Sequence, residues 1–208
     1  MLCCVRDLPG TRNPELGTFF PMRIIAGNSK GRKLSSPKGK NTRPTSDRVR
    51  EAIFSIVGDL VVDARVLDLY AGTGAMGLEA LSRGARQAVF VEMDPAALRC
   101  LDKNIETCRC KDRSEVVNRP VISYLGKLDT GGEFDLVFTD PPYMGDLGTL
   151  TLLAISKHAK PLKRCLIILE HAPDRPPEPV PHDMIRVDTR KYGNVGVTFL
   201  QFKKNKGA

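Results

Sequence analysis

Long apolar runs are missing from this sequence. No stretch of its 208 residues approaches the roughly 20 apolar residues that a membrane-spanning helix needs. The start, MLCCVRDLPG, has too short an apolar core for a signal peptide and reaches a charge at Arg6. We therefore expect a cytoplasmic protein with no membrane partner, whose length suits one substantial core.

Metal-ligand spacings are missing as well. The three histidines are scattered, and none of the six cysteines stands in the C-x₂-C pairing that zinc sites favour. Cys3 and Cys4 are adjacent, whereas Cys108 and Cys110 have one residue between them. We expect free thiols in a reducing compartment and no metal site.

Acidic residues are scarce in residues 22–50, where Asp47 is the only acid among nine basic residues. The formal net charge of the whole chain is +8, so this block accounts for the entire excess. A solvated basic face is the ordinary explanation of a charge run. Such concentration nevertheless favours a polyanionic partner, and nucleic acid is the leading candidate. The basic residues are Arg23, Lys30, Arg32, Lys33, Lys38, Lys40, Arg43, Arg48 and Arg50.

The chain divides into three expected parts. Residues 1–21 contain several prolines and glycines without periodicity, which indicates a flexible leader, and Met22 is the expected natural start. Residues 22–58 suggest a basic unit made of a β-hairpin, turning at Gly27-Asn28, and a helix. Residues 59–208 form the remaining domain.

The helix of the basic unit follows a loop that ends at Pro44. Thr45 can cap this helix, and Asp47 suits its first turn. The apolar residues of the segment recur at helical spacing on one face, which predicts that this face is buried. These residues are Val49, Ile53, Ile56 and Val57.

Beyond residue 58 the pattern alternates between strands and helices. Apolar, β-rich runs are separated by helical segments, which predicts an α/β fold with a doubly wound, mostly parallel, Rossmann-like sheet. The last two strands are joined around residues 192–194 as a hairpin, which would make one edge strand antiparallel. The seven expected strands lie at residues 65–70, 88–93, 115–117, 134–140, 165–170, 184–189 and 195–202.

A glycine-rich turn joins the first strand to the next helix. Gly72-x-Gly74-x-x-Gly77 matches the dinucleotide fingerprint, and Glu92 ends the second strand twenty residues after Gly72. A tight strand-to-helix turn would explain the glycines alone, but the joint occurrence favours a ligand that contains adenosine. The glycines also permit NAD, whereas Asp68 would repel a pyrophosphate and attract an ammonium, so S-adenosylmethionine fits better. Capping of the local turn is the alternative role of Asp68.

The sequence TDPPY ends the fourth strand, and ligands of open α/β sheets bind outside the carboxyl ends of strands. Asp140 should therefore face the same crevice as Gly72 and Glu92. Its carboxylate and the carbonyl of Pro141 can accept hydrogen bonds from an exocyclic amine of a base and aim the nitrogen lone pair at a methyl group. Tyr143 can stack on a base that has left its helix.

Several stretches now point to a known family. They are MRIIAG, RPTSDRVREAIFSIV, VLDLYAGTGAMGLEALSRGA, FVEMD, FDLVFTDPPY and KYGNVGVTFL. From Met22 onward the chain resembles the bacterial 16S ribosomal RNA guanine-N2 methyltransferases, within the class I S-adenosylmethionine-dependent fold. DPPY and the glycine loop are shared with many methyltransferases, whereas RPTSDRVREAIF beside MRIIAG is much more specific.

The resemblance implies methyl transfer to one guanine of 16S RNA, in the small subunit or an assembly intermediate, and we expect a monomer. It implies cofactor contacts from Asp68, Tyr70, Gly72, Thr73, Gly74, Glu92, Met93 and Asn118. It places the target base on Asp140, Pro141 and Tyr143. RNA contacts are expected from Lys38, Lys40, Arg43, Thr45 and Arg48.

Two other functions remain open at this point. DNA adenine-N6 methylation uses the same DPPY chemistry, but the roughly 24 residues between strands four and five leave no room for a target-recognition domain. A non-catalytic RNA-binding assembly factor would have no need for Asp140 or an intact glycine loop. Protein glutamine methylation and a redox reaction fit less well.

Overall fold

The computed structural model of the chain describes residues 22–37, 46–128, 132–143, 145–158 and 160–204. The expected leader, residues 1–21, and most of the basic loop, residues 38–45, lie outside the described residues.

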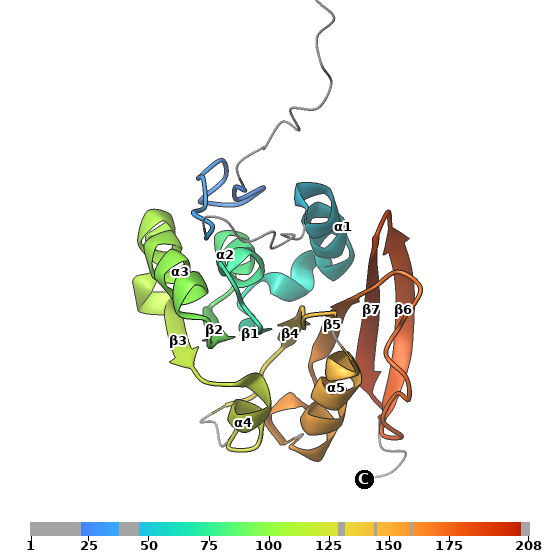
Figure 1. Ribbon diagram of the computed structural model, residues 1–208. Helices are drawn as coiled ribbons and strands as arrows, with labels where there is room; N and C mark the ends of the chain where they lie inside the picture. Colours follow the sequence, from blue (N-terminus) through green and yellow to red (C-terminus); the bar gives the residue numbers. More distant parts are fainter. Residues whose placement is uncertain (1–21, 38–45, 129–131, 144, 159, 205–208) are drawn as a thin grey trace, which may run out of the picture.

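A seven-stranded sheet with the order β3-β2-β1-β4-β5-β7-β6 forms the middle of the molecule (Figure 1). β1 to β5 pair in parallel, and β7 runs antiparallel to both of its neighbours. This confirms the predicted sheet. β6 is the edge strand, and β7 lies between β6 and β5. The strands are β1 Arg65–Leu69, β2 Gln87–Glu92, β3 Ser114–Asn118, β4 Leu136–Thr139, β5 Leu166–His171, β6 Met184–Tyr192 and β7 Val195–Phe202.

Helices cover both faces of the sheet. Figure 1 shows α1, α2 and α3 on one side, with the N-terminal segment beyond α2 and α3, and α4 and α5 on the other. Two separate clusters of buried apolar side chains fill the two interfaces. The α-helices are α1 Asp47–Val57, α2 Ala75–Ser82, α3 Pro95–Cys108, α4 Val121–Leu125 and α5 Leu147–Lys157. Short 3₁₀ segments lie at Gly58–Val61, Lys111–Arg113 and Lys160–Leu162.

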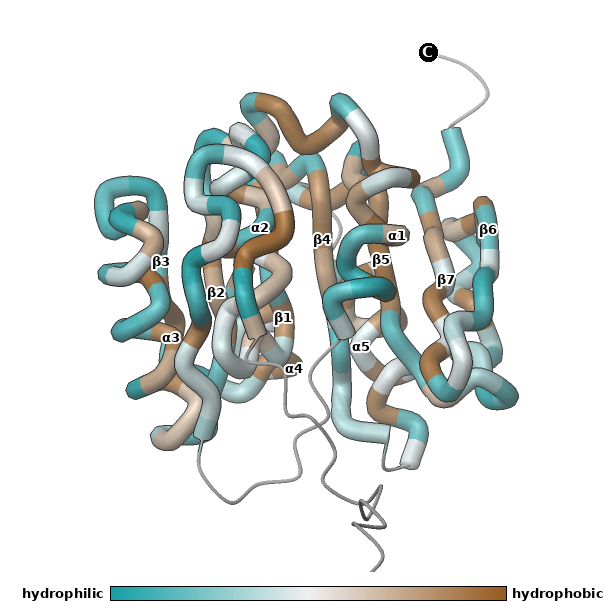
Figure 2. Tube along the Cα trace, turned by 90° about the horizontal axis from the view of Figure 1, so that it is seen from above, coloured by the Kyte–Doolittle hydropathy of each residue, from teal (hydrophilic) through white to brown (hydrophobic). Residues whose placement is uncertain are grey.

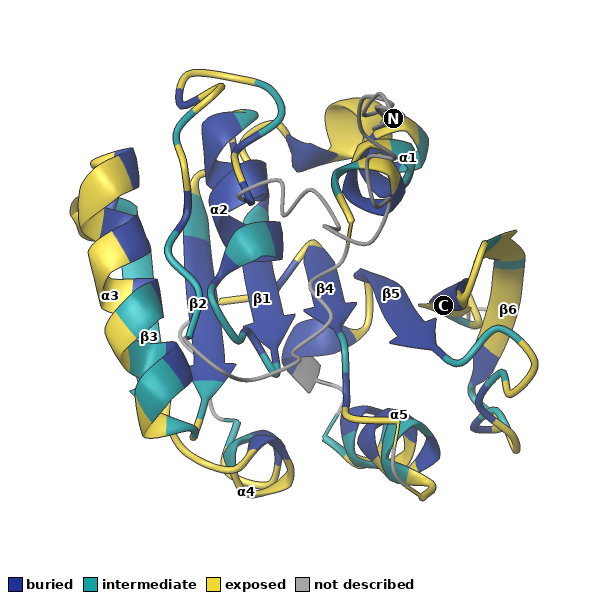
Figure 3. Cartoon of the chain, turned by 45° about the horizontal axis from the view of Figure 1, so that its top comes forward, coloured by how far each residue is buried: buried dark blue, intermediate teal, exposed yellow. Residues whose placement is uncertain are grey.

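Burial explains why the central strands read as continuous apolar runs. Parallel strands that are covered on both faces have no solvent side, so polar residues do not alternate along them. Figure 2 shows hydrophobic colour along β4 and β5, and Figure 3 shows β1, β4 and β5 as buried. β6 carries mostly exposed residues on the outer edge (Figure 3), because only one strand pairs with it.

The N-terminal cap of α1 differs from the expectation. Ser46, not Thr45, is the capping residue, and its hydroxyl accepts a hydrogen bond from the backbone N–H of Val49 at 3.3 Å. A capping side chain reaches the N–H three residues later, and the helix begins at Asp47, so Ser46 has the required position. The predicted acidic residue of the first turn is confirmed.

The expected N-terminal hairpin is reduced to an isolated bridge between Arg23 and Lys33. Its turn packs on the end of α2, where the N–H of Asn28 donates to the carbonyl of Ser82 at 2.8 Å. A Cβ at Gly27 would lie 1.8 Å from that same carbonyl oxygen, and Gly27 has φ +78°. Glycine is therefore needed for the hairpin to approach α2 this closely.

Buried charges also hold the hairpin against α2. Glu79 is fully buried, and its two carboxylate oxygens accept hydrogen bonds from the N–H groups of Ile25 at 2.7 Å and Ala26 at 3.0 Å. Arg83 donates to Glu79 at 2.8 Å, and Nε of Arg50 lies 3.8 Å from it. This network joins the hairpin, α1 and α2 around one carboxylate.

Candidate active site

Sheet order brings three loops to one edge of the sheet. β1 lies between β2 and β4, so the carboxyl ends of these parallel strands are neighbours. Glu92 ends β2, Asp140 directly follows β4, and Asp68 is the fourth residue of β1. Asp68 pairs with Phe90 of β2 and Phe138 of β4, which lie two residues before Glu92 and Asp140, so the three predicted site residues lie at the same edge.

The three glycines of the loop have different surroundings. A Cβ at Gly74 would lie 2.3 Å from a methyl group of Leu101, and one at Gly77 would lie 2.3 Å from the ring of Phe90. A Cβ at Gly72 would meet nothing closer than 3.9 Å, although its φ of +56° still favours glycine. Gly74 and Gly77 therefore serve close packing, and Gly72 leaves room for a ligand.

Glu92 organises the backbone around the glycine loop. One carboxylate oxygen accepts from the N–H of Gly72 at 2.8 Å, and the other accepts from Met93 at 2.7 Å and Asp94 at 2.8 Å. A carboxylate offers about four acceptor positions, so these bonds leave one free on the Gly72 side. Glu92 can therefore accept from one further hydroxyl group.

Asp68 is buried, and it accepts a hydrogen bond from the N–H of Gly77 at 2.9 Å. Burial raises its pKa to about 8, with a further rise from the charges of Asp140 and Glu92 and an opposing effect of the Gly77 bond. Burial also raises the pKa of Asp140 to about 6. Among the described residues, no ion pair involves any of these three carboxylates. The crevice therefore favours a cationic ligand.

A cavity of about 210 Å³ lies beside the residue pair Pro141-Pro142, on the side of β5 and α5. Pro141 is buried, whereas Tyr143 is 45% exposed and lines the cavity. The sequence following Asp140 thus presents a rigid backbone and an accessible ring next to a hollow. The backbone and the ring suit the binding of a flat, polar ligand group in this cavity.

The comparisons with known proteins agree with this arrangement. The family model described as "Conserved hypothetical protein 95" matches residues 22–201. The chain is 39% identical over 159 residues to ribosomal RNA small subunit methyltransferase D of Escherichia coli strain K12, covering 76% of this chain and 79% of that one. The enzyme of the same name from Haemophilus influenzae is 37% identical over 158 residues, covering 74% and 81%. The solved structure of yhhF from Escherichia coli is similar, with a TM-score of 0.77, 36% identity, and coverage of 88% of this chain and 99% of that one.

The chain belongs to the ribosomal RNA small subunit methyltransferase D family. The resemblance drawn from the sequence is confirmed, as is the methyltransferase fold. Neither DNA adenine methylation nor a non-catalytic assembly role is favoured by these relatives.

Other residues that the family resemblance suggested for the cofactor lie around the same edge. Asn118 ends β3 beside Glu92 and is exposed, and Met93 is 59% exposed. The hydroxyl of Tyr70 is instead bonded to Thr151 of α5 at 2.8 Å, and that of Thr73 donates to the sulfur of Met22 at 3.6 Å. The side chains of Tyr70 and Thr73 thus bind other parts of the protein.

Asn104 of α3 was missed in the sequence. Its side chain is fully buried and donates to the carbonyls of Thr73 at 2.9 Å and Ser35 at 3.0 Å, while it accepts from the N–H of Ser35 at 2.7 Å. It therefore joins the glycine loop to the N-terminal segment. The available signal was an amide that interrupts the apolar stripe of Leu101 and Ile105.

The expected RNA contacts are only partly covered by the structure. Lys38, Lys40, Arg43 and Thr45 lie outside the described residues, and Arg48 is exposed on α1. Arg50 was counted in the basic block but is fully buried, where desolvation lowers its pKa despite Glu79 and Asp47 nearby. Arg50 forms ion pairs with Asp47 and Glu79, so it adds little to the surface charge of the block.

Within the described ranges, no helix is long and apolar enough to cross a membrane, and no three metal-binding side chains are grouped together. Cys100, Cys108, Cys110 and Cys165 are free cysteines.

Proposed function

We propose that this chain transfers a methyl group from S-adenosylmethionine to the exocyclic N2 amine of a guanine in 16S ribosomal RNA. The observation that carries this proposal is the grouping of Asp68, Glu92 and Asp140 around an open Gly72, in a chain of the small subunit methyltransferase D family. The substrate is the small subunit or one of its assembly intermediates, and the enzyme acts as a cytoplasmic monomer.

The three grouped carboxylates suit the charge of the cofactor. S-adenosylmethionine carries an ammonium and a sulfonium, and the carboxylates of the crevice have no cationic partner among the described residues. Asp68 would hold the ammonium, and Glu92 would accept from one ribose hydroxyl at its remaining position. Met93 and Asn118, both exposed at the ends of β2 and β3, would contact the adenine.

When bound, the cofactor supplies a methyl group activated by its sulfonium centre. Asp140 accepts a hydrogen bond from the guanine N2 amine, and the carbonyl of Pro141 accepts the second, which orients the lone pair. Tyr143, which is partly exposed, stacks on the base. The methylated nitrogen must lose a proton, and the carboxylate of Asp140, with its pKa raised to about 6, accepts it.

The basic unit of residues 22–58 holds the RNA substrate against the methyltransferase domain of residues 59–208. Arg48, which is exposed on α1, is its contact within the described residues. Lys38, Lys40, Arg43 and Thr45 belong to the same basic block in sequence and supply the remaining contacts to phosphates.

Ribosomal RNA from cells that lack this protein tests the proposed function. Mass spectrometry should show the loss of one N2-methylguanine from 16S RNA, and the purified protein should restore it with S-adenosylmethionine. Unchanged methylation of 16S RNA in those cells, or restoration of a methyl group on adenine, would contradict the proposal.

Cofactor binding should depend on pH through Asp68. Because the pKa of Asp68 is raised to about 8, its carboxyl is largely protonated at neutral pH before a cation binds. A bound ammonium favours the ionised form, so binding releases a proton, and affinity should rise by up to about tenfold per pH unit below that pKa, until the α-amino group of the ligand loses its own proton. Calorimetry from about pH 6 to about pH 8 measures this rise, which should be much smaller in the variant Asp68→Asn. An equally small rise in the unmodified protein would refute the assignment.

A further inference from the structure

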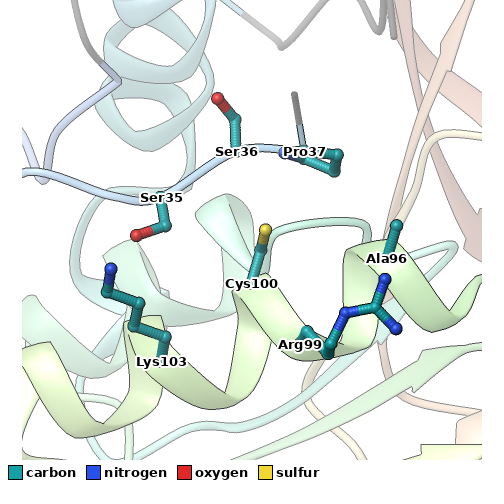
Figure 4. A pocket seen from close by; sticks show the side chains of 7 residues that line it. All are labelled: Ser35, Ser36, Pro37, Ala96, Arg99, Cys100 and Lys103. Atoms are coloured by element: carbon teal, nitrogen blue, oxygen red, sulfur yellow. The ribbon is translucent and has the colours of Figure 1, made fainter. Parts of the chain in front are cut away.

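A groove lies between the N-terminal segment and α3, outside the carboxylate crevice. Residues 35–37 form one wall, and Ala96, Arg99, Cys100 and Lys103 of α3 form the other, around a volume of about 540 Å³. Figure 4 shows the side chains of Cys100 and Lys103 pointing from α3 toward Ser35 and Ser36, and that of Arg99 extending along the helix toward Ala96. We call this hollow the α3 groove.

The α3 groove offers positive charge and hydroxyl groups to a ligand. Arg99 and Lys103 are exposed, and neither makes an ion pair or a side-chain hydrogen bond in the part of the chain that the structure describes. Ser35 and Ser36 add hydroxyls on the opposite wall, and no carboxylate lines the groove. The exposed acids of α3, Asp102 and Glu106, are not among its lining residues.

The spacing of the two cations suits a nucleic acid strand. Arg99 and Lys103 are four residues apart on one helix face, which separates them by about 6 Å along the axis. Two cations at this separation on one helix face can contact neighbouring phosphates of one strand. The hydroxyls of Ser35 and Ser36 can donate to the same oxygens.

The groove is mechanically joined to the cofactor loop. Asn104 follows Lys103 and bonds Ser35 on one side and Thr73 of the glycine loop on the other. Ala96, at the other end of the groove, is in the first turn of α3, directly after the loop that Glu92 organises. A strand lying in the groove would thus run beside the cofactor-binding edge of the sheet.

We propose that the α3 groove binds the phosphate backbone of a single RNA strand that flanks the target guanine. This proposal rests on the proposed function, because it assigns a second contact surface to the same RNA substrate. Arg99 and Lys103 pair with successive phosphates, and the serine hydroxyls donate to them from the other wall. The groove then extends the RNA contact of the basic block of residues 22–50, which supplies one of its walls, onto α3.

The test reverses both charges of the groove in one variant, Arg99→Glu/Lys103→Glu. A matched control, Lys163→Glu/Arg164→Glu, makes the same charge change at two exposed residues. They lie just before β5, at the amino ends of the parallel strands. Binding is measured by fluorescence anisotropy with unmethylated small-subunit RNA over a range of salt concentrations. The affinity of each variant for S-adenosylmethionine is measured by calorimetry.

The groove variant should bind the RNA about tenfold more weakly at low salt, with a salt slope reduced by about 1.4 for two lost contacts to a single strand. The control should keep most of its affinity, and both should bind the cofactor as the unmodified protein does. Unchanged RNA affinity and slope in the groove variant would overturn the proposal. Loss of cofactor affinity alone would assign the groove to the cofactor instead.

Failure of this proposal differs from failure of the proposed function. If the unmodified protein methylates 16S RNA while the groove variant binds RNA normally, only the groove assignment is wrong. If the unmodified protein methylates no ribosomal RNA, the proposed function itself is wrong.

Discussion

Asp140→Ala is expected to slow methyl transfer by about 100- to 1,000-fold. In the proposed mechanism, the side chain accepts a hydrogen bond from the guanine amine and then its proton, and burial raises its pKa to about 6, so the carboxylate is ionised at neutral pH. Affinity for S-adenosylmethionine should change by less than about tenfold, because Asp68 and Glu92 remain. Single-turnover methylation of unmethylated small subunits, together with calorimetry, separates the two effects.

Thr139→Val is the matched control for this variant. Thr139 precedes Asp140, is buried, and its hydroxyl has no hydrogen-bond partner among the described residues. Valine has nearly the same shape, so the change removes an unsatisfied polar group and should leave the methylation rate close to that of the unmodified protein. A methylation rate in Asp140→Ala equal to that of this control would exclude the proposed role of the carboxylate.

Glu79→Ala is expected to lower the free energy of unfolding by about 3 to 5 kcal/mol. The change removes one of the two carboxylates that face the buried Arg50, leaving only Asp47, and removes the acceptor of the N–H groups of Ile25 and Ala26. For a chain of this size, the midpoint of thermal unfolding should fall by about 6 to 20 °C. Circular dichroism during heating and in urea measures both quantities.

One further variant separates charge from hydrogen bonding at Glu79, and a second serves as a control. Glu79→Gln keeps an acceptor for one backbone N–H and should be destabilised less than Glu79→Ala. Glu51→Ala changes an exposed glutamate of α1 and should shift stability by less than about 0.5 kcal/mol. If Glu79→Ala is as stable as Glu51→Ala, the buried network does not hold the N-terminal hairpin.

Much of the fold follows from the sequence because burial on both faces leaves a clear pattern. The apolar runs of β1, β4 and β5 predict strands without any knowledge of their neighbours, and the helices between them predict parallel pairing. Local detail was less accessible. Thr45 and Ser46 are equally good capping residues in composition, and only the register of α1 decides between them.

The charged residues show where sequence reasoning fails. Arg50 belongs to a basic run, but its burial depends on Glu79, which is 29 positions away in the sequence. Counting charges along the chain therefore could not separate a structural arginine from surface ones. Asn104 was missed for a related reason, since its partners Ser35 and Thr73 come from two distant segments.

The carboxylates Asp68, Glu92 and Asp140 could be grouped in advance because the carboxyl ends of neighbouring parallel strands meet at one edge. What the sequence did not reveal is that the backbone of the loop already occupies most acceptor positions of Glu92. It also did not reveal the α3 groove, whose two walls are separated by nearly sixty residues of chain.

The three hydrogen bonds of Asn104 make this position unusually intolerant of replacement. Aspartate would keep the acceptor for the N–H of Ser35 but lacks the donors for the two carbonyls, whereas leucine lacks both donors and acceptor and would release Ser35 and Thr73 together. If the proposed cofactor and RNA sites are right, a change there should raise the Michaelis constants of S-adenosylmethionine and of the RNA in parallel. Laboratory evolution of one substrate preference without the other must therefore proceed through other positions.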